Sequence, residues 1–329
     1  MSSNKTAIVT GISGQDGSYL SELLRNKKYH LIGVTIQDVP APTEGVEYER
    51  GDISDRSFVE HLIARYKPDE IYNMASIATV AKPWEDPIAV AQVAGMAPLY
   101  FLESIRQFSP QTRFFQASSA EMYGSVTESP QSEQTRFAPV NPYGAAKLFA
   151  HNMTEMYRNS HGTFAVSGIL FNHESPRRPL GFVTRKITHT LAAIAQSGSG
   201  VLQLGNLDAE RDWSYAGDIV EGMWMSLQHD APGTYVFASG EVHTVREFVQ
   251  VAARCLGMDL HWQGEDVDEK ALDAQGRVVV EVNPDFYRPV ETHVRRGDIS
   301  HAKEILDWKP QTSFHDLVEM MVRADKVTT

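Results

Sequence analysis

Three glycines between an apolar run and a helical pattern constrain the fold of this chain more than any other feature. Residues 7–10 have the β-branched, apolar character of a buried strand, and residues 18–25 carry leucines at helical spacing. Between them lie Gly11, Gly14 and Gly17, in a GxxGxxG pattern. A strand, a glycine turn and a helix in this order predict the start of a dinucleotide-binding βαβ unit.

Each glycine of this turn has a physical task. The first permits a tight turn, the second lets the backbone approach a pyrophosphate, and the third lets the helix pack on the strand. The positive end of the helix dipole then faces the phosphates. We therefore expect a nicotinamide dinucleotide to contact the residues of the turn: Gly11, Ser13, Gly14, Gln15, Asp16 and Gly17.

The second predicted strand ends near Asp38, where a carboxylate would accept hydrogen bonds from both ribose hydroxyls and repel a 2′-phosphate. No arginine lies between Arg25 and Arg50 to hold such a phosphate. These two observations favour NAD(H) over NADP(H). After the third strand, Asp52 and Ile53 are expected to contact the adenine.

Strand-like and helical segments alternate regularly through the first half of the chain. This alternation predicts an α/β protein with a Rossmann-like, doubly wound parallel sheet covered by helices on both faces. Near residue 171 the pattern becomes shorter and more irregular. We expect a dinucleotide-binding domain at residues 1–171 and a smaller α/β substrate lobe at 172–329, with some of its segments returning to the first domain.

Composition excludes several classes of partner. The formal net charge of −12 disfavours nucleic acid and anionic membranes. A single cysteine, Cys255, excludes an intramolecular disulfide and a zinc site of several thiolates, and no metal site is expected. Neither a signal-peptide pattern nor a window of roughly 18 apolar residues was identified. These features predict a cytoplasmic protein.

Tyr143 and Lys147 are four residues apart in a helical pattern, so their side chains lie one above the other on one helix face. A tyrosine that acts as a base near pH 7 needs its pKa lowered by about three units from 10, which a nearby ammonium and an oxidised nicotinamide ring can supply. Ser119, at the end of a preceding strand, would hydrogen-bond the substrate hydroxyl being oxidised. Glu121, two residues further on, could serve as a second acid/base group.

Together these motifs resemble the extended short-chain dehydrogenase/reductase family, and within it the GDP-mannose 4,6-dehydratases. The resemblance covers almost the whole chain. It rests on residues 11–20, 116–124, 142–148, 168–178, 182–187, 204–208, 211–213 and 288–289, and on Glu291.

The resemblance implies a redox-neutral loss of water from a GDP-sugar. The cofactor takes hydride from C4 of the hexose with Tyr143 as base and Lys147 tuning it. The new ketone acidifies the C5 proton, Glu121 removes that proton as the C6 hydroxyl leaves, and hydride returns to C6. The alternative within the family is a GDP-sugar 4-reductase or epimerase, which needs no C5 deprotonation. A nucleotide-sensing protein without catalysis is a third alternative.

The resemblance also implies that Asn172, Lys186, Arg211 and Arg288 hold the GDP moiety, with Glu291 near its ribose or sugar. The matching runs add Glu174, Arg178 and Val183 to the expected substrate contacts. A cluster of basic residues suits a diphosphate and comprises Arg177, Arg178, Arg185 and Lys186.

Three positions depart from the family pattern. Residues 37–49 replace an arginine-bearing loop that grips the cofactor's phosphate and helps build a tetramer, and they contain no basic residue. The resemblance favours NADP(H), whereas this departure and Asp38 favour NAD(H). Without the loop that helps build a tetramer, we expect a homodimer through the helical residues 98–108 and 143–159. Ala78 and Thr79 replace a serine–histidine pair, and Ala94 replaces an acidic residue. These changes leave a GDP-heptose or another GDP-hexose as alternative substrates to GDP-mannose.

Overall fold

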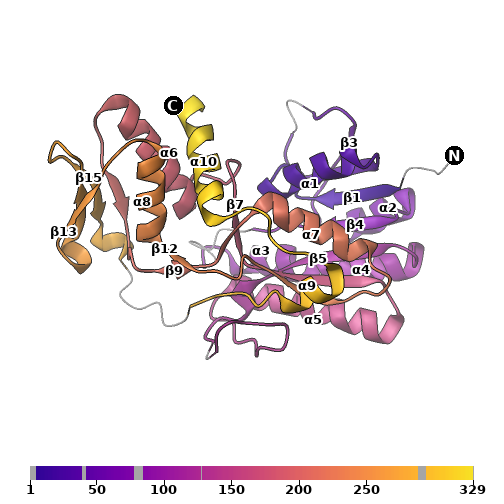
Figure 1. The fold of residues 1–329 in the computed structure, drawn as a ribbon. Coiled ribbons are helices and arrows are strands. Elements are labelled where there is room, and N and C mark those ends of the chain that lie inside the picture. Colours follow the sequence, from indigo (N-terminus) through magenta and orange to yellow (C-terminus); the bar gives the residue numbers. More distant parts are fainter. Residues whose placement is uncertain (1–4, 39–41, 78–83, 127, 288–293, 329) are drawn as a thin grey trace.

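The glycine turn follows the first strand of a seven-stranded parallel sheet. This sheet forms the centre of the first lobe (Figure 1). The computed structural model describes residues 5–38, 42–77, 84–126, 128–287 and 294–328. Within them the strand order is β11-β6-β5-β4-β1-β2-β3, and every neighbouring pair is parallel. The strands are β1 (Thr6–Thr10), β2 (His30–Thr35), β3 (Val46–Arg50), β4 (Glu70–Asn73), β5 (Arg113–Ser119), β6 (Ala165–Leu170) and β11 (Thr234–Phe237).

Helices cover both faces of this sheet because successive strand residues point to opposite sides. Val9 of β1 packs in a cluster with Leu20 of α1 (Gln15–Asn26) and Met223 of α7 (Ala216–Gln228). Its neighbour Ile8 packs on the other face, in a cluster with Leu62 and Phe101. The helices of that second face are α2 (Arg56–Tyr66), α4 (Ala97–Phe108) and α5 (Pro142–His161). The predicted fold class is thereby confirmed.

One continuous helical stretch corrects the prediction about membrane-spanning windows. Residues 87–108 comprise α3 (Pro87–Val90), the π-helical segment η1 (Ala91–Met96) and α4, and they are long and apolar enough to cross a bilayer by length and composition. Polar residues such as Gln92 and Glu103 interrupt this stretch, so it contains no unbroken apolar run of that length. In the fold, half of this window is buried, and Phe101 and Ile105 are fully buried in the core beside the sheet, whereas Ile88 and Phe108 near its two ends are exposed. These contacts are those of a core helix.

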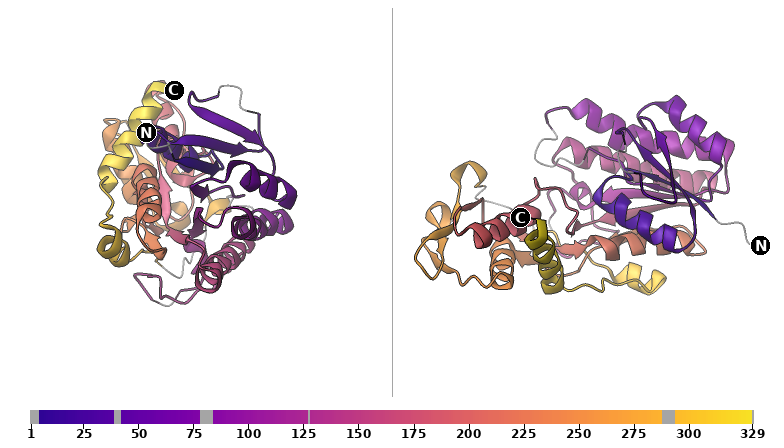
Figure 2. Two further views of the ribbon diagram at one scale, coloured as in Figure 1. Left: turned by 90° about the vertical axis from the view of Figure 1, so that its right-hand side faces the viewer. Right: turned by 90° about the horizontal axis from the view of Figure 1, so that it is seen from above.

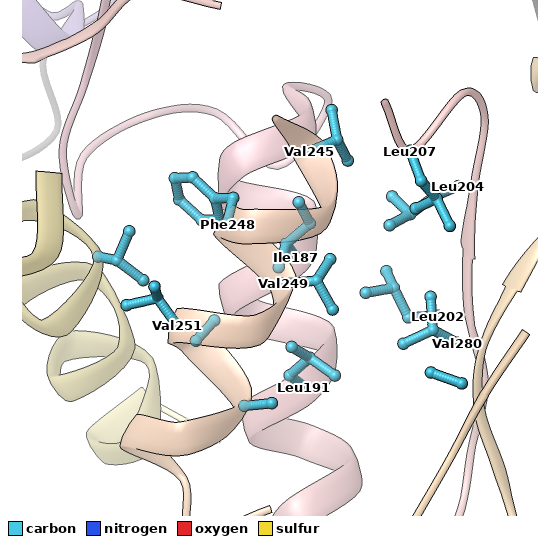
Figure 3. Close-up of a cluster of buried hydrophobic side chains, with 14 of the residues drawn as sticks. Ile187, Leu191, Leu202, Leu204, Leu207, Val245, Phe248, Val249, Val251 and Val280 are labelled. Atoms are coloured by element: carbon cyan, nitrogen blue, oxygen red, sulfur yellow. The ribbon is translucent and has the colours of Figure 1, made fainter. Parts of the chain in front are cut away.

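The second lobe has a separate core between a small sheet and three helices (Figure 3). The sheet has the order β13-β14-β15-β8 and comprises β8 (Leu202–Leu204), β13 (His261–Gln263), β14 (Lys270–Leu272) and β15 (Val278–Val282). Helices α6 (Val183–Ser197), α8 (Val245–Cys255) and α10 (Phe314–Thr328) pack together beside it. Phe248 of α8 and Leu191 of α6 are among the fully buried side chains of this core.

Several late segments pack on the first lobe although the chain has already entered the second. Strand β11 lies at the edge of the large sheet, α7 covers its face, and α9 (Ser300–Leu306) packs against β11 (Figures 1 and 2). Two further short pairs lie outside both sheets, β7 (Asn172–Glu174) with β10 (Trp213–Tyr215) and β9 (Glu210–Arg211) with β12 (His243–Thr244). Short helices lie at η2 (Ala120–Met122), η3 (Asp266–Asp268) and η4 (Pro284–Phe286).

Candidate active site

A cavity of about 520 Å³ lies at the carboxyl ends of β1, β2, β3 and β4. Strand β1 is flanked by β2 on one side and β4 on the other, so the order of the sheet reverses direction here. Open α/β sheets bind ligands outside the carboxyl ends of their strands at such a switch point. The residues of the glycine turn line the cavity, together with Asp52 and Ile53.

The glycine turn has the geometry that a dinucleotide needs. Gly11 adopts the left-handed φ of +69°, and a Cβ on Gly17 would lie 2.3 Å from the carbonyl oxygen of Gly11. The first glycine therefore makes the turn, and the third allows helix and strand to touch. Gly14 is the N-cap of α1 and provides no side-chain cap. The first amide groups of α1 are thus available to a phosphate at the lip of the cavity.

The side chains of Gln15 and Asp16 connect the turn to β7. Gln15 donates from Nε2 to the carbonyl oxygen of His173 at 3.0 Å, and its Oε1 accepts from Ser175 at 2.8 Å. Asp16 forms an ion pair with His173 at 2.9 Å. Burial alone would raise the pKa of Asp16, but the charge and hydrogen bond of His173 lower it to about 2. These two predicted cofactor residues therefore also fix the turn against the start of the second lobe.

Asp38 lies apart from the cavity lining, which includes Gln37 just before it. Its exposed carboxylate pairs with Arg50 at the end of β3. Sequence reasoning treated Arg50 only as the limit of a stretch without arginine, because the register that places it beside the end of β2 is a property of the sheet. A cation therefore lies beside the position expected to select the ribose.

Ser119, Tyr143 and Lys147 lie together at the junction of β5 and α5. Ser119 ends β5, and Tyr143 lies in the first turn of α5. The hydroxyls of Ser119 and Ser76 lie close enough to the phenol of Tyr143 to lower its pKa. The Nζ of buried Lys147 lies 5.6 Å from the centroid of the Tyr143 ring and donates to the carbonyl oxygen of Ala117 at 2.7 Å.

Burial dominates the electrostatics of this cluster. It raises the pKa of Tyr143 to about 12, although the hydroxyls of Ser119 and Ser76 lower it. Burial also lowers the pKa of Lys147 to about 8. The protein by itself therefore does not supply the downward shift that a tyrosine base requires. The positive charge of a bound nicotinamide ring would lower this pKa.

Glu121 lies close enough to Tyr143 for its charge to raise the pKa of the phenol. Its Oε2 accepts from Asn141 at 2.9 Å, and its Oε1 pairs with Arg295. Asn141 is also the N-cap of α5, because its Oδ1 accepts from the amide of Gly144 at 2.8 Å. A Cβ on Gly144 would lie 2.6 Å from the carbonyl oxygen of Glu121, so this glycine allows α5 to pack directly on η2.

Two contacts of Glu121 were missed from the sequence for different reasons. Asn141 carries a local signal, since an asparagine directly before Pro142 is a typical start of a helix. Arg295 carries none, because it lies 174 residues away from Glu121 along the chain.

Gln92 and Val93 of η1 line the cavity and were also missed. Ala94 is buried beside Ala146 and Tyr143, so its small side chain lets η1 pack against α5.

Three of the four residues in the basic cluster near α6 are paired with carboxylates. Arg177 pairs with Glu22, Arg178 with Glu174, and Arg185 with the fully buried Asp325 of α10. Lys186 differs, since its Nζ lies 4.5 Å from the centroid of the Phe286 ring and no carboxylate partner occurs among the described residues. Burial lowers the pKa of Lys186. Arg178 lines the dinucleotide cavity and lowers the pKa of Tyr143 by its charge.

The remaining predicted substrate residues fall into three groups. Asn172 is exposed on β7, Val183 begins α6 without a side-chain cap, and Arg211 lies on β9. Glu174 is buried, and its carboxylate accepts from Thr184 at 2.5 Å while pairing with Arg178, so it supports other side chains instead of presenting a free carboxylate. Arg288, Glu291, Ala78 and Thr79 lie outside the described residues.

Comparison with known proteins agrees with this geometry. A family model described as GDP-mannose 4,6 dehydratase matches residues 8–321. The GDP-mannose 4,6-dehydratase of Sinorhizobium fredii is 42% identical over 99% of this chain and 97% of its own length. The fold is similar to that of RMD from Pseudomonas aeruginosa complexed with NADPH, with a TM-score of 0.80, 21% identity and coverage of 99% and 100% of the two chains. It is equally similar to UDP-glucose 4-epimerase from Thermus thermophilus in complex with NAD, with a TM-score of 0.80, 22% identity and coverage of 98% and 100%.

The family that the motifs resemble is thus confirmed over nearly the full length of the sequence. A family model that matches residues 8–321 and a relative at 42% identity show the same family. This chain belongs to the GDP-mannose 4,6-dehydratase family.

Proposed function

We propose that this chain is a GDP-sugar 4,6-dehydratase that converts GDP-mannose, or a close GDP-hexose or GDP-heptose, to the 4-keto-6-deoxy sugar. One observation carries the proposal beyond the family assignment. The Glu121 carboxylate and the Tyr143 phenol interact within one cluster that also contains Ser119 and Lys147. A simple oxidoreductase of this type needs the tyrosine and lysine, whereas the second acid/base group is needed for elimination.

The residues around the large cavity fit a nicotinamide dinucleotide. Gly11, Gly14 and Gly17 provide the turn, and the uncapped start of α1 provides amide donors. The cofactor would be NAD(H) or NADP(H), as in the two structural neighbours. Asp38 favours NAD(H), while Arg50 would hold a 2′-phosphate only if its ion pair with Asp38 opened. When bound, this group would take hydride from C4 of the sugar and return it to C6.

Side chains of the protein then transfer the protons. Tyr143 accepts the proton of the C4 hydroxyl, Ser119 hydrogen-bonds that hydroxyl, and Lys147 provides a cation beside the phenol. The C4 ketone acidifies C5, so Glu121 removes the C5 proton and gives it to the C6 hydroxyl, which leaves as water. C5 finally receives one proton, and Tyr143 releases the proton that it accepted, so the number of protons on the protein is unchanged. The overall change is the loss of one water.

Lys186 is the residue that we assign to the diphosphate. Its ammonium is partly desolvated by its surroundings and has an aromatic neighbour but no carboxylate among the described residues. It lies in the first turn of α6, whose N-terminal amides begin at Val183. A helix start and a cation together form a site for an anion. Asn172, Arg178, Arg211, Arg288 and Glu291 complete the proposed substrate set.

The assembly and location are part of the same proposal. Phe149 and Met156 on the outer face of α5 are 38% and 54% exposed although both are large and apolar. They lie two helical turns apart on one face, next to α4, and a second copy could cover them through paired α4 and α5 helices. We therefore propose a homodimer, and from the sequence features above we propose that it is cytoplasmic.

The test is incubation of the purified enzyme with GDP-mannose and, in parallel, GDP-heptose. We expect mass spectrometry of the product to show the loss of one water without net oxidation or reduction of the cofactor. Replacement Glu121→Gln then separates a dehydratase from a 4-reductase or epimerase, because only the dehydratase should lose most of its activity. If no GDP-sugar loses water, the dehydratase assignment fails.

A further inference from the structure

Arg295 is the only described cation that forms an ion pair with Glu121, and it comes from a segment far away in the sequence. The side chains of Glu121 and Arg295 are 15% and 27% exposed, so the pair is largely shielded from water. Charged groups in such a position interact more strongly than at the surface. This ion pair therefore holds an arginine against the proposed acid/base group.

The backbone around Arg295 is fixed by one fully buried side chain, Gln131. Its main chain exchanges hydrogen bonds with Arg296 and Asp298 at 2.8 Å each. Its amide side chain donates to the carbonyl oxygen of Val294 at 3.2 Å and accepts from the amide of Arg296 at 3.0 Å. These contacts lie on both sides of Arg295, so its guanidinium is presented to Glu121 from a restrained backbone.

The carboxylate of Glu121 thus has one donor on each oxygen. Asn141 donates to Oε2, and Arg295 pairs with Oε1. An ionised carboxylate has about four lone-pair sites, so two partners orient it and still leave sites for a proton. Asn141 is itself held by its capping bond to Gly144 in the first turn of α5. The rotamer of Glu121 is therefore set by two partners from different parts of the chain.

We propose that Arg295 is a positioning residue that holds the Glu121 carboxylate for the elimination step. This inference rests on the proposed dehydratase function and assigns a role to a residue outside the expected site. Arg295 acts on C5/C6 elimination through Glu121 and has no part in C4 oxidation, which depends on Tyr143, Lys147 and Ser119. The two half-reactions should therefore respond differently to its loss.

The experiment compares Arg295→Met with the matched control Arg296→Met. Both changes remove one arginine charge from the same segment and keep the backbone bonds to Gln131. Rapid mixing with GDP-mannose follows two signals: reduced nicotinamide by absorbance, and loss of water by mass spectrometry. For Arg295→Met we expect C4 oxidation at the normal rate, accumulation of reduced cofactor, and water loss slowed about 100-fold. Arg295→Lys should recover part of the loss, and Arg296→Met should behave as wild type.

Three results would overturn the proposal. Equal slowing of oxidation and elimination would make Arg295 a merely structural residue, and a raised KM at unchanged kcat would make it a substrate contact. Wild-type elimination in Arg295→Met would remove its role altogether. Failure of the proposed function is distinguishable from all three, because the wild-type enzyme itself would then release no water from any GDP-sugar.

Discussion

In the first lobe the glycine turn at the cavity depends on backbone geometry, whereas in the second lobe the candidate ligand contacts are charged side chains. The glycine turn has a left-handed φ at Gly11 and leaves no space for a side chain at Gly17. Beside α6, in contrast, Arg177, Arg178 and Arg185 are bound to carboxylates of the protein itself. A backbone site is determined by its local sequence, but the availability of a charge depends on partners that are distant in the chain.

Tyr143→Phe should have the largest effect, because it removes the proton acceptor without altering either ligand site. We expect kcat for water loss to fall about 1,000-fold, while the affinity for GDP stays within a factor of two or so. Steady-state kinetics and calorimetric titration measure the two quantities. Normal turnover in this variant would show that another group accepts the C4 proton.

Gly17→Ala tests the backbone side of the comparison. A Cβ at this position would meet the carbonyl oxygen of Gly11 at 2.3 Å, and overpacking of this kind costs about 3 kcal/mol in the free energy of unfolding. At the matched position Gly14 the same contact would be 3.2 Å. Gly14→Ala should therefore keep most of the stability in urea unfolding and lose mainly dinucleotide affinity. Equal stability of the two variants would contradict this account of the turn.

Arg185→Met and Lys186→Met test the charged side, since the two residues are neighbours on α6. Arg185→Met leaves buried Asp325 without its arginine and should cost about 3 kcal/mol of unfolding free energy. Lys186→Met should leave stability unchanged and weaken GDP-sugar binding about tenfold. Urea unfolding and titration with GDP-mannose separate the two effects. The reverse pattern would show that Arg185, and not Lys186, holds the diphosphate.

The smallest effect concerns pH and the contact between the lobes. The pKa of Asp16 is lowered to about 2 from an ordinary value of 3.8, so its ion pair with His173 adds stability above pH 3.8 that is lost as the pH falls toward 2. His173 stays protonated in this range because the charge of Asp16 raises its pKa against the effect of burial. The stability difference between wild type and Asp16→Asn should therefore shrink by about 2 kcal/mol between about pH 5 and about pH 2. A difference that does not change with pH would refute the role of this pair.

The same contrast explains what could be predicted from the sequence. The alternation of strands and helices, the glycine turn and the Tyr143–Lys147 pair follow from local spacing, so their prediction needed no knowledge of distant residues. The engagement of Gln15 and Asp16 with β7 could not be seen, because the contacts to Ser175 and His173 join residues about 160 positions apart. Arg185 was grouped with Lys186 for the same reason, since its partner Asp325 lies 140 residues further on.

The central claim is that one enzyme-bound cofactor carries hydride from C4 to C6 while Tyr143 and Glu121 move the protons. It is tested most directly with GDP-mannose that carries deuterium at C4. The account predicts a 4-keto-6-deoxy product with the deuterium at C6 of the same sugar molecule, even in a mixture with unlabelled substrate. Deuterium that is lost to solvent, or shared between labelled and unlabelled molecules, would contradict it.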